Sequence, residues 1–492
     1  MKLIKPAGAI VVFTILFFVS ADCRTGSGED KVPVTTSSEK AMEQYLEGRD
    51  LAERLRAQES IQYFTNAINE DPDFAMAYLL RVPVQIGAKE LFEDLNKAVS
   101  LADKVSEGER LQILGLQAGF NGNTKKQEEY YSKLASMYPN DERALSLLAN
   151  LYFGQQENQK AVDLYNKILK INPDFSPVLN QLGYAQRTLE NYAEAEKAFK
   201  KYTELIPDDP NPYDSYAELL LKMGRFDESI EYYNKALQQN PDFIASYIGL
   251  SANYMYLGKY DAAHEQMLKL TGIAKNDGQK RTAMFIDAVI YIDEGKPDMA
   301  IKEFEKQITL DEKNKDYANI SADILTIAIV LHETGKADEA LQQFRKSVDV
   351  FDKSSAQQGA KDNARLTLLS NESKIAMFQG DYTTAKAKAD EYMKGVTALN
   401  NPNQVRLAHE LYGLLALSQE EADKALTELS KASSLNPYNF YRMAAAYRLK
   451  GDMEKAKEYC EKAINFNQLP NMNVAYARVR AKELMGTLLA TQ

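Results

Sequence analysis

The residues that could carry out acid–base, nucleophilic or metal chemistry are spread thinly along the chain. His264, His332 and His409 lie in distant segments, and none forms the i, i+4 pair or the cysteine-rich spacing of a metal site. Residues 311–316 (DEKNKD) have acidic spacing similar to a calcium loop, but they lack its glycine and its closing glutamate. The chain also has no glycine-rich phosphate loop and no Gly-x-Ser-x-Gly elbow. The sequence therefore predicts no catalytic centre, no metal ion and no cofactor.

The first 21 residues have the features of a signal peptide. Lys2 and Lys5 precede an apolar run over residues 7–19. This run is short for a membrane span but has the length of the apolar core of a signal peptide. The sequence therefore predicts export, either to the periplasm or to a membrane surface.

The two cysteines have different expected roles. Cys23 follows the apolar run and resembles the lipid-attachment cysteine of bacterial lipoproteins, with residues 22–40 as a polar tether. Asp22 stands before it, where that class has Gly, Ala or Ser. Plain secretion and lipid attachment at Cys23 therefore both stay open. Cys460 occupies a position where other segments carry an aromatic residue, and we expect a buried apolar thiol there.

The dominant pattern in the chain is a period of 34 residues. Pro139, Pro173, Pro207 and Pro241 follow one another at this interval. Between successive prolines, a small residue, a second small residue and an aromatic residue return in phase. The three sets are Ala149, Ala161 and Tyr165, then Gly183, Ala195 and Phe199, then Ala217, Ser229 and Tyr233.

This pattern resembles the tetratricopeptide repeat (TPR). The resemblance implies an all-α fold in which helical hairpins stack into a superhelix, an α-solenoid with the first helix of each hairpin, helix A, on the concave wall. Apolar spacing predicts helix A over residues 177–187 and the second helix, helix B, over residues 193–205. Small side chains at Gly183 and Ala195 let these two helices approach closely. The segment 172–175 (NPDF) separates hairpins, because proline has no amide hydrogen and disfavours helix at the residue before it.

Weaker copies of the pattern extend along most of the chain and give roughly eleven or twelve hairpins by the period argument. Pro83 interrupts helix A of the second unit. Two polar segments, 275–280 and 353–363, predict joints between sub-arrays. The expected parts are an N-terminal array over 41–275, middle repeats over 281–352, C-terminal repeats over 364–468 and a capping helix within 469–492.

Partner specificity in TPR proteins normally comes from helix A side chains that face the groove. The polar side chains at such positions here are Asn150, Asn180, Tyr184, Arg187, Asn211, Asp214 and Glu218. Amides, a phenol and carboxylates along a groove suit hydrogen bonding to a peptide backbone, and a solvated polar wall is the alternative. The Lys and Arg clamp with which some TPR proteins hold a C-terminal carboxylate is not matched, since its cations are absent.

An apolar stretch of the groove is predicted further along the chain. The helices A expected over residues 282–292 and 320–331 are apolar nearly all round. Their groove-facing positions are Phe285, Val289, Ile292, Leu325 and Ile329. An apolar groove suits a hydrophobic segment of a partner. The alternative is that the superhelix tightens here and packs on itself or on a second copy.

Composition narrows the class of function. The 492 residues are 45% hydrophobic and carry a net charge of −11, which argues against nucleic acid as a partner. The leading hypothesis is a non-catalytic scaffold of the cell envelope that binds a protein or peptide in the groove and reaches a membrane only through a lipid anchor. The alternatives are a solute-binding surface lipoprotein and an accessory subunit of an envelope enzyme or transport complex. Fold analogy selects no ligand, and the oligomeric state is not predicted.

Overall fold

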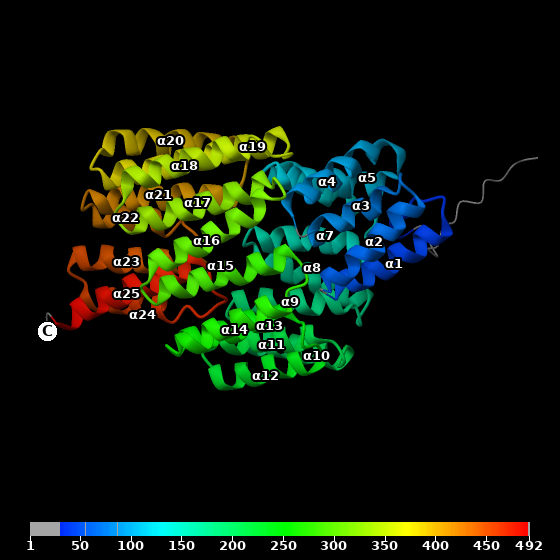
Figure 1. Ribbon diagram of the computed structural model, residues 1–492, viewed down its shortest axis with the longest axis horizontal. Coiled ribbons are helices and arrows are strands. Elements are labelled where there is room, and N and C mark those ends of the chain that lie inside the picture. The colour runs from blue at the N-terminus through cyan, green and yellow to red at the C-terminus, as the bar shows by residue number, and fades with distance from the viewer. Residues whose placement is uncertain (1–29, 55, 86, 491–492) are drawn as a thin grey trace, which may run out of the picture.

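The computed structural model describes residues 30–54, 56–85 and 87–490. In this part of the chain there are 25 α-helices, two short 3-10 helices and no β-strand, so the predicted all-α solenoid is confirmed (Figure 1). The helices are α1 (Glu39–Glu53), α2 (Ala57–Glu70), α3 (Ala75–Arg81), η1 (Val82–Val84), α4 (Ala88–Leu101), η2 (Ala102–Lys104), α5 (Glu107–Phe120), α6 (Thr124–Met137), α7 (Glu142–Gly154), α8 (Asn158–Ile171), α9 (Ser176–Thr188), α10 (Tyr192–Leu205), α11 (Pro210–Lys222), α12 (Phe226–Gln239), α13 (Ile244–Tyr256), α14 (Tyr260–Ile273), α15 (Asp277–Asp293), α16 (Pro297–Glu312), α17 (Tyr317–Glu333), α18 (Ala337–Phe351), α19 (Gln358–Phe378), α20 (Tyr382–Ala398), α21 (Pro402–Ser418), α22 (Ala422–Leu429), α23 (Pro437–Lys450), α24 (Met453–Ile464) and α25 (Met472–Ala490).

The helices from α1 to α24 form twelve consecutive pairs, and α25 follows the last pair. The helices A and B predicted over 177–187 and 193–205 are α9 and α10, each within one residue of the predicted bounds. Their close approach is built on Gly183, where a Cβ atom would lie 2.5 Å from Cζ of Phe199. The small residue therefore makes room for the aromatic ring of the paired helix, as the pattern predicts.

The turn between helix A and helix B repeats a left-handed backbone conformation. Gly122, Gln156, Glu190, Gly224 and Gly258 are 34 residues apart, and all have φ between 61° and 73°. Two of the five are not glycine, although a side chain disfavours this conformation. The period therefore fixes the turn geometry even where the residue type does not suit it.

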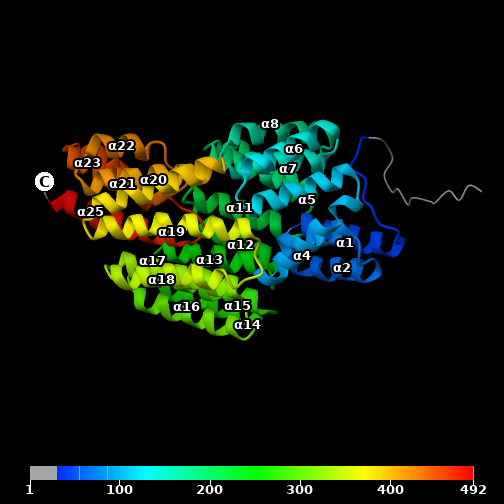
Figure 2. The same ribbon diagram turned by 90° about the horizontal axis from the view of Figure 1, so that it is seen from above.

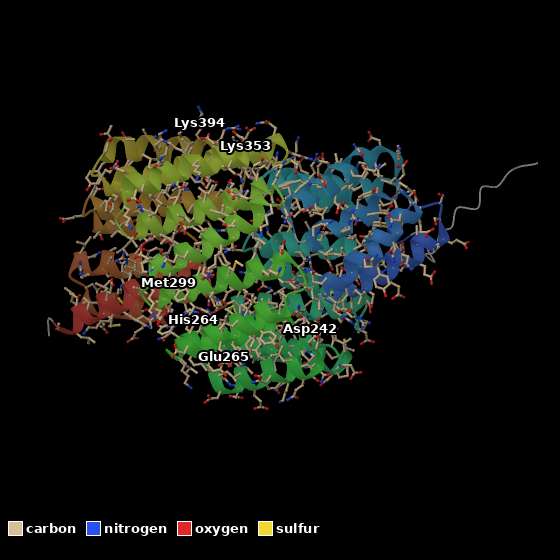
Figure 3. The ribbon with its side chains drawn as sticks, viewed as in Figure 1. Asp242, His264, Glu265, Met299, Lys353 and Lys394 are labelled. Atoms are coloured by element: carbon tan, nitrogen blue, oxygen red, sulfur yellow. The ribbon has the colours of Figure 1, made fainter. Side chains whose placement is uncertain are left out.

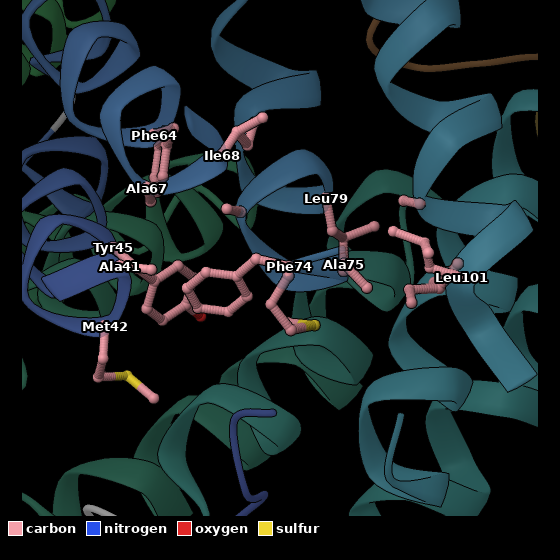
Figure 4. Packing of buried hydrophobic residues seen from close by; sticks show 14 of the residues in the cluster. Ala41, Met42, Tyr45, Phe64, Ala67, Ile68, Phe74, Ala75, Leu79 and Leu101 are labelled. Carbon is pink, nitrogen blue, oxygen red and sulfur yellow. The ribbon is translucent and has the colours of Figure 1, made fainter. Parts of the chain in front are cut away.

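Each hairpin buries a small core that continues into the next hairpin. In the first one, the ring of Tyr45 lies 6.2 Å from that of Phe64 and 5.0 Å from that of Phe74, measured between centroids (Figure 4). Phe64 belongs to α2, and Phe74 directly precedes α3. The aromatic residues thus join neighbouring units, which is why a single hairpin would not be stable alone.

The expected interruption at Pro83 is confirmed, because α3 ends at Arg81 and a 3-10 helix follows. The two predicted joints are shorter than expected. Helix α15 begins at Asp277 within the first, where the Asn276 side chain accepts a hydrogen bond from the Gln279 amide and caps the helix. Helix α19 begins at Gln358 within the second. The division into three arrays stays a prediction.

Later repeats touch the edges of earlier ones. The Asn121 side chain donates a hydrogen bond to Gln357 at 3.2 Å, and the Asn403 side chain donates to the Gly154 carbonyl at 2.9 Å. In Figure 2 the ends of α19 and α20 meet the repeats of α4 to α7. The superhelix therefore winds tightly enough for residues more than 200 positions apart to bond, and this closure shapes the groove.

Candidate binding groove

The polar part of the groove centres on α9 and α11. The Tyr184 hydroxyl donates to Oε2 of Glu218 at 2.8 Å, and Nη1 of Arg187 donates to Oε1 of the same carboxylate at 2.7 Å. The guanidinium lies 4.7 Å from the centre of the Tyr184 ring. Burial raises the pKa of Tyr184 well above its usual value, so the phenol stays neutral. These three predicted groove residues form one partly exposed network of internal hydrogen bonds, and their binding to a peptide stays a prediction.

The remaining predicted polar residues do not join this network. Asn150 is exposed, and its Oδ1 accepts a hydrogen bond from Tyr165 at 2.7 Å. Asn180 is buried, and its Oδ1 has no hydrogen-bond partner among the described residues. The Asn211 side chain donates to the Tyr202 hydroxyl at 2.6 Å and is buried.

Asp214 is also buried, at 8% exposure, and accepts a hydrogen bond from Ser246 at 2.7 Å. Burial raises the pKa of this carboxyl to about 7. Asn180, Asn211 and Asp214 are thus buried rather than exposed to a groove, and the part that any of these residues plays in binding stays a prediction.

The predicted apolar groove is occupied by the chain itself. Val289 and Ile292 are 0% and 3% exposed, and they share a core cluster with residues 475–477 of α25. The expectation that they form an open surface is wrong, and the alternative that this wall packs on itself fits the structure. Phe285 and Ile329 are partly buried against the same cluster.

Leu325 lies in a different part of the structure from the other four predicted apolar positions. It lines an apolar cavity of about 340 Å³ between α17 to α19 and the first repeats, with Phe92 and Phe344 among its neighbours. The five apolar positions predicted to share one groove are thus divided between two environments.

The residues between α24 and α25 also pack against the chain itself, beside α11 and α13. The Tyr256 hydroxyl donates to the Gln468 carbonyl at 2.8 Å and accepts from the Gln468 amide at 3.0 Å. Nζ of Lys222 lies 3.6 Å from the centre of the Phe466 ring. The C-terminal segment therefore runs from the end of α11 past α13 and α15.

A cleft of about 610 Å³ opens where this segment meets the polar groove. Arg187, Tyr192 and Lys222 line one side, and Phe440 and Lys462 are among the residues that line the other. Burial, with a contribution from the Arg187 guanidinium, lowers the pKa of Lys222 to about 8. Lys222 has no ion-pair partner among the residues that the structure describes. Glu190, Glu458 and Glu461 also line the cleft, so it carries charges of both signs, with Lys222 as a cation that has no direct carboxylate contact.

Sequence reasoning did not identify Lys222, Tyr256 or Phe466. Lys222 is separated from Glu218 by one helical turn, and extending the groove positions by a turn would have found it. Phe466 follows α24, in the connection to α25, and no repeat phase could have placed its side chain.

Asp311, His264 and Cys460 make contacts within the fold. Asp311, the first residue of the predicted acidic run, forms an ion pair with Arg281. Nδ1 of His264 lies 2.6 Å from Asp287. Among the described residues, no group of His, Cys, Asp and Glu side chains could hold a metal ion. Cys460 is a buried thiol, and burial raises its pKa to about 11.

Within residues 30–490, as far as they are described, no helix combines the length and apolar character needed to cross a bilayer. Cys23 and the predicted signal peptide lie outside the described residues.

Comparisons with known proteins identify repeats in the same places. Models of the tetratricopeptide repeat match residues 142–175, 164–197, 217–243, 288–314 and 439–468.

Among curated relatives, the cell division cycle protein 16 homolog of Homo sapiens is 28% identical over 160 residues, which cover 30% of this chain and 26% of that one. A TPR repeat-containing protein of Pseudomonas aeruginosa is 29% identical over 189 residues, which cover 36% and 31% of the two chains. The matches thus span about a quarter to a third of these relatives. A solved tetratricopeptide repeat protein from Parabacteroides merdae is 18% identical and covers 58% of this chain and 99% of that one, with a TM-score of 0.36.

Proposed function

Because this chain is an all-α solenoid of tetratricopeptide repeats, we propose that it is a non-catalytic protein–protein interaction scaffold whose groove binds a partner protein or peptide. The observation that carries the proposal is the cleft beside α11, which joins the network of Tyr184, Arg187 and Glu218 to Lys222. The half-buried Lys222 ammonium contacts the Phe466 ring and is influenced by the Glu190 carboxylate at longer range, but it forms no direct ion pair among the described residues, so an acidic group of a partner would bind there favourably.

The proposed setting is the cell envelope. The predicted signal peptide supports export, and Cys23 supplies a thiol for lipid attachment. The protein is then either periplasmic or anchored to a membrane by that lipid. Fractionation of cells that produce the parent and the Cys23→Ala variant separates the two cases, since only an anchored protein moves from the membrane to the soluble fraction on substitution.

The binding proposal is tested by crosslinking in the native envelope, followed by purification and identification of the bound proteins. The test variant is Lys222→Glu, which reverses the charge in the cleft. The matched control is Lys394→Glu, because Lys394 is exposed on α20 at the upper edge of the molecule in Figure 3.

We expect one partner to be recovered with the parent and with Lys394→Glu, and to be lost with Lys222→Glu. Equal recovery with all three proteins would remove the cleft as the binding site. Recovery of no specific protein with the parent would contradict the scaffold itself.

A further inference from the structure

The N-terminal half of α25 is seated on the inner wall of the middle repeats. Val474 shares a core cluster with Met255 of α13 and Ile290 of α15. Residues 475–477 share another with Val289 and with residues of α16, α17 and α23. Their sequence is Ala-Tyr-Ala, so small side chains flank one aromatic ring. This half of the helix therefore packs as an inserted element, enclosed by several repeats at once.

A buried ion pair also joins α25 to this wall. Nε of Arg478 donates to Oδ1 of Asp293 at 2.9 Å, and the two side chains are 6% and 0% exposed. The Arg478 guanidinium lies 4.4 Å from the centre of the Tyr256 ring, and Nη2 of Arg480 donates to the Glu333 carbonyl at 2.9 Å. A buried carboxylate at the end of α15 thus requires a cation from whatever helix lies on this wall.

Capping the solenoid does not require these contacts. The C-terminal half of α25 covers the last hairpin, where Ala481, Leu484 and Leu488 share a cluster with Ala444 and Cys460. That contact alone buries the exposed face of the final repeat. The N-terminal half therefore does something that a cap does not need.

The fit of this half is incomplete. The Tyr476 hydroxyl is buried and has no hydrogen-bond partner among the described residues. A buried hydroxyl that loses its bonds to water without replacing them weakens the association that buries it. A helix that carried an apolar ring at this position would lack that defect.

From these contacts we infer that the wall formed by α13, α15 and α17 is a docking surface for a helix of a partner protein, and that α25 is the internal competitor for it. The partner helix presents small apolar residues around one aromatic side chain and an arginine directed at Asp293. This inference rests on the proposed scaffold function and assigns it a second surface, separate from the cleft at Lys222.

Because α25 is joined to the rest of the chain by a short linker, it competes strongly with a free helix for the wall. A segment joined by a short linker has an effective concentration on the order of millimolar. If a free helix binds the wall with an intrinsic Kd of about 1 μM, competition by α25 raises its apparent Kd about 1000-fold. Weakening α25 alone must then strengthen binding of a free helix.

The probe is a fluorescent synthetic peptide of residues 469–490, titrated with the full chain. We expect weak binding to the parent and at least 10-fold tighter binding to a chain carrying Arg478→Glu, which repels α25 from Asp293 but leaves the wall unchanged. A chain carrying Arg448→Glu, on the exposed face of α23, is the control and should behave as the parent. A peptide that itself carries Arg478→Glu should not bind.

A second variant with a smaller change controls for misfolding of the Arg478→Glu chain. Arg480→Ala removes the hydrogen bond to the Glu333 carbonyl and the longer contacts with the Glu333 and Glu483 carboxylates. It should tighten peptide binding about 2- to 5-fold, because charge-assisted contacts of α25 with the wall are lost. Circular dichroism verifies that each chain is folded.

Absence of peptide binding to folded Arg480→Ala and Arg478→Glu chains would overturn the inference, and so would equal binding of the charge-reversed peptide. If the parent forms dimers and binds no peptide, the wall is the contact surface of a second copy, and the inference is overturned as well. Since no cellular partner is used, these outcomes are independent of the crosslinking test at Lys222.

Discussion

Replacing Asp214 with asparagine is expected to stabilise the protein above neutral pH. The carboxyl group is buried, and the Ser246 hydroxyl donates a hydrogen bond to it at 2.7 Å. Burial raises its pKa from 3.8 to about 7, with a smaller contribution from the nearby Glu218 carboxylate. The folded protein therefore binds a proton that the unfolded chain releases.

The magnitude follows from linkage. Between about pH 4 and pH 7 the folded state holds more protons, so the free energy of unfolding falls as the pH rises and levels off above 7. The full loss is about 4 kcal/mol, since each pKa unit is worth about 1.4 kcal/mol. Asparagine keeps the oxygen that accepts from Ser246 and cannot ionise. Its second amide hydrogen lacks a partner, which costs about 1–2 kcal/mol, so we expect a net gain of about 2 kcal/mol at pH 8.

The assay is urea unfolding followed by circular dichroism at pH 4.5, 6 and 8. The stability difference between Asp214→Asn and the parent should be near zero or negative at pH 4.5 and should grow with pH. Asp174→Asn, an exposed carboxylate in the turn before α9, is the control and should show no such trend. A difference that does not change with pH, or a less stable asparagine variant at pH 8, would refute the burial argument.

Three further outcomes are expected from single substitutions or labelling. Gly183→Leu should lower the free energy of unfolding by about 1–3 kcal/mol or more in thermal or urea melts, because its side chain collides with Phe199; an unchanged melt would contradict the assigned phase. Glu190→Gly should raise the free energy of unfolding by about 1 kcal/mol, because φ at this position is 61° and glycine adopts it without strain. Glu194→Gly, in the helix that follows, should lower it by about 1 kcal/mol. Equal effects of the two substitutions would contradict strain at Glu190. In a Cys23→Ala chain, Cys460 should resist maleimide at pH 7.5 until urea unfolds the protein, and rapid labelling of the folded chain would exclude a buried thiol.

The sequence predicts the hairpins well because their signals are local. The small residue at Gly183, the ring of Phe199 and the proline at 173 act within one unit, and the structure places α9 and α10 where these residues require them. The error at residues 275–280 has a local cause as well. A polar run indicates a loop, but Asn276, the second residue of this run, caps a helix, and the polar residues after it form the first turn of α15.

The groove is harder to predict, because repeat phase gives the direction of a side chain but not what lies opposite. Asp214 occupies a position that commonly faces the groove, yet Ser246 of the next repeat reaches it. Val289 and Ile292 have the apolar character of a docking wall, but the structure buries them in a core cluster. Part of that cluster comes from residues 475–477, almost 190 positions later, and no period links the two segments.

The way the superhelix closes does leave a trace in the sequence. Left-handed turn residues are 34 positions apart up to Gly258, but the next intervals, to Gly295, Gly335 and Gly380, are 37, 40 and 45. The longer units contain longer helices, 17 residues in α15 and α17 and 21 in α19, where α7, α9, α11 and α13 have 13. Since the shape of a solenoid follows from small rotations between successive repeats, a change of helix length in the second half alters how each unit stacks on the one before. The loops of these longer units meet the first repeats, and the helices α15 and α17 pack against α25, so the departure from the 34-residue period marks the part of the chain where the superhelix closes on itself.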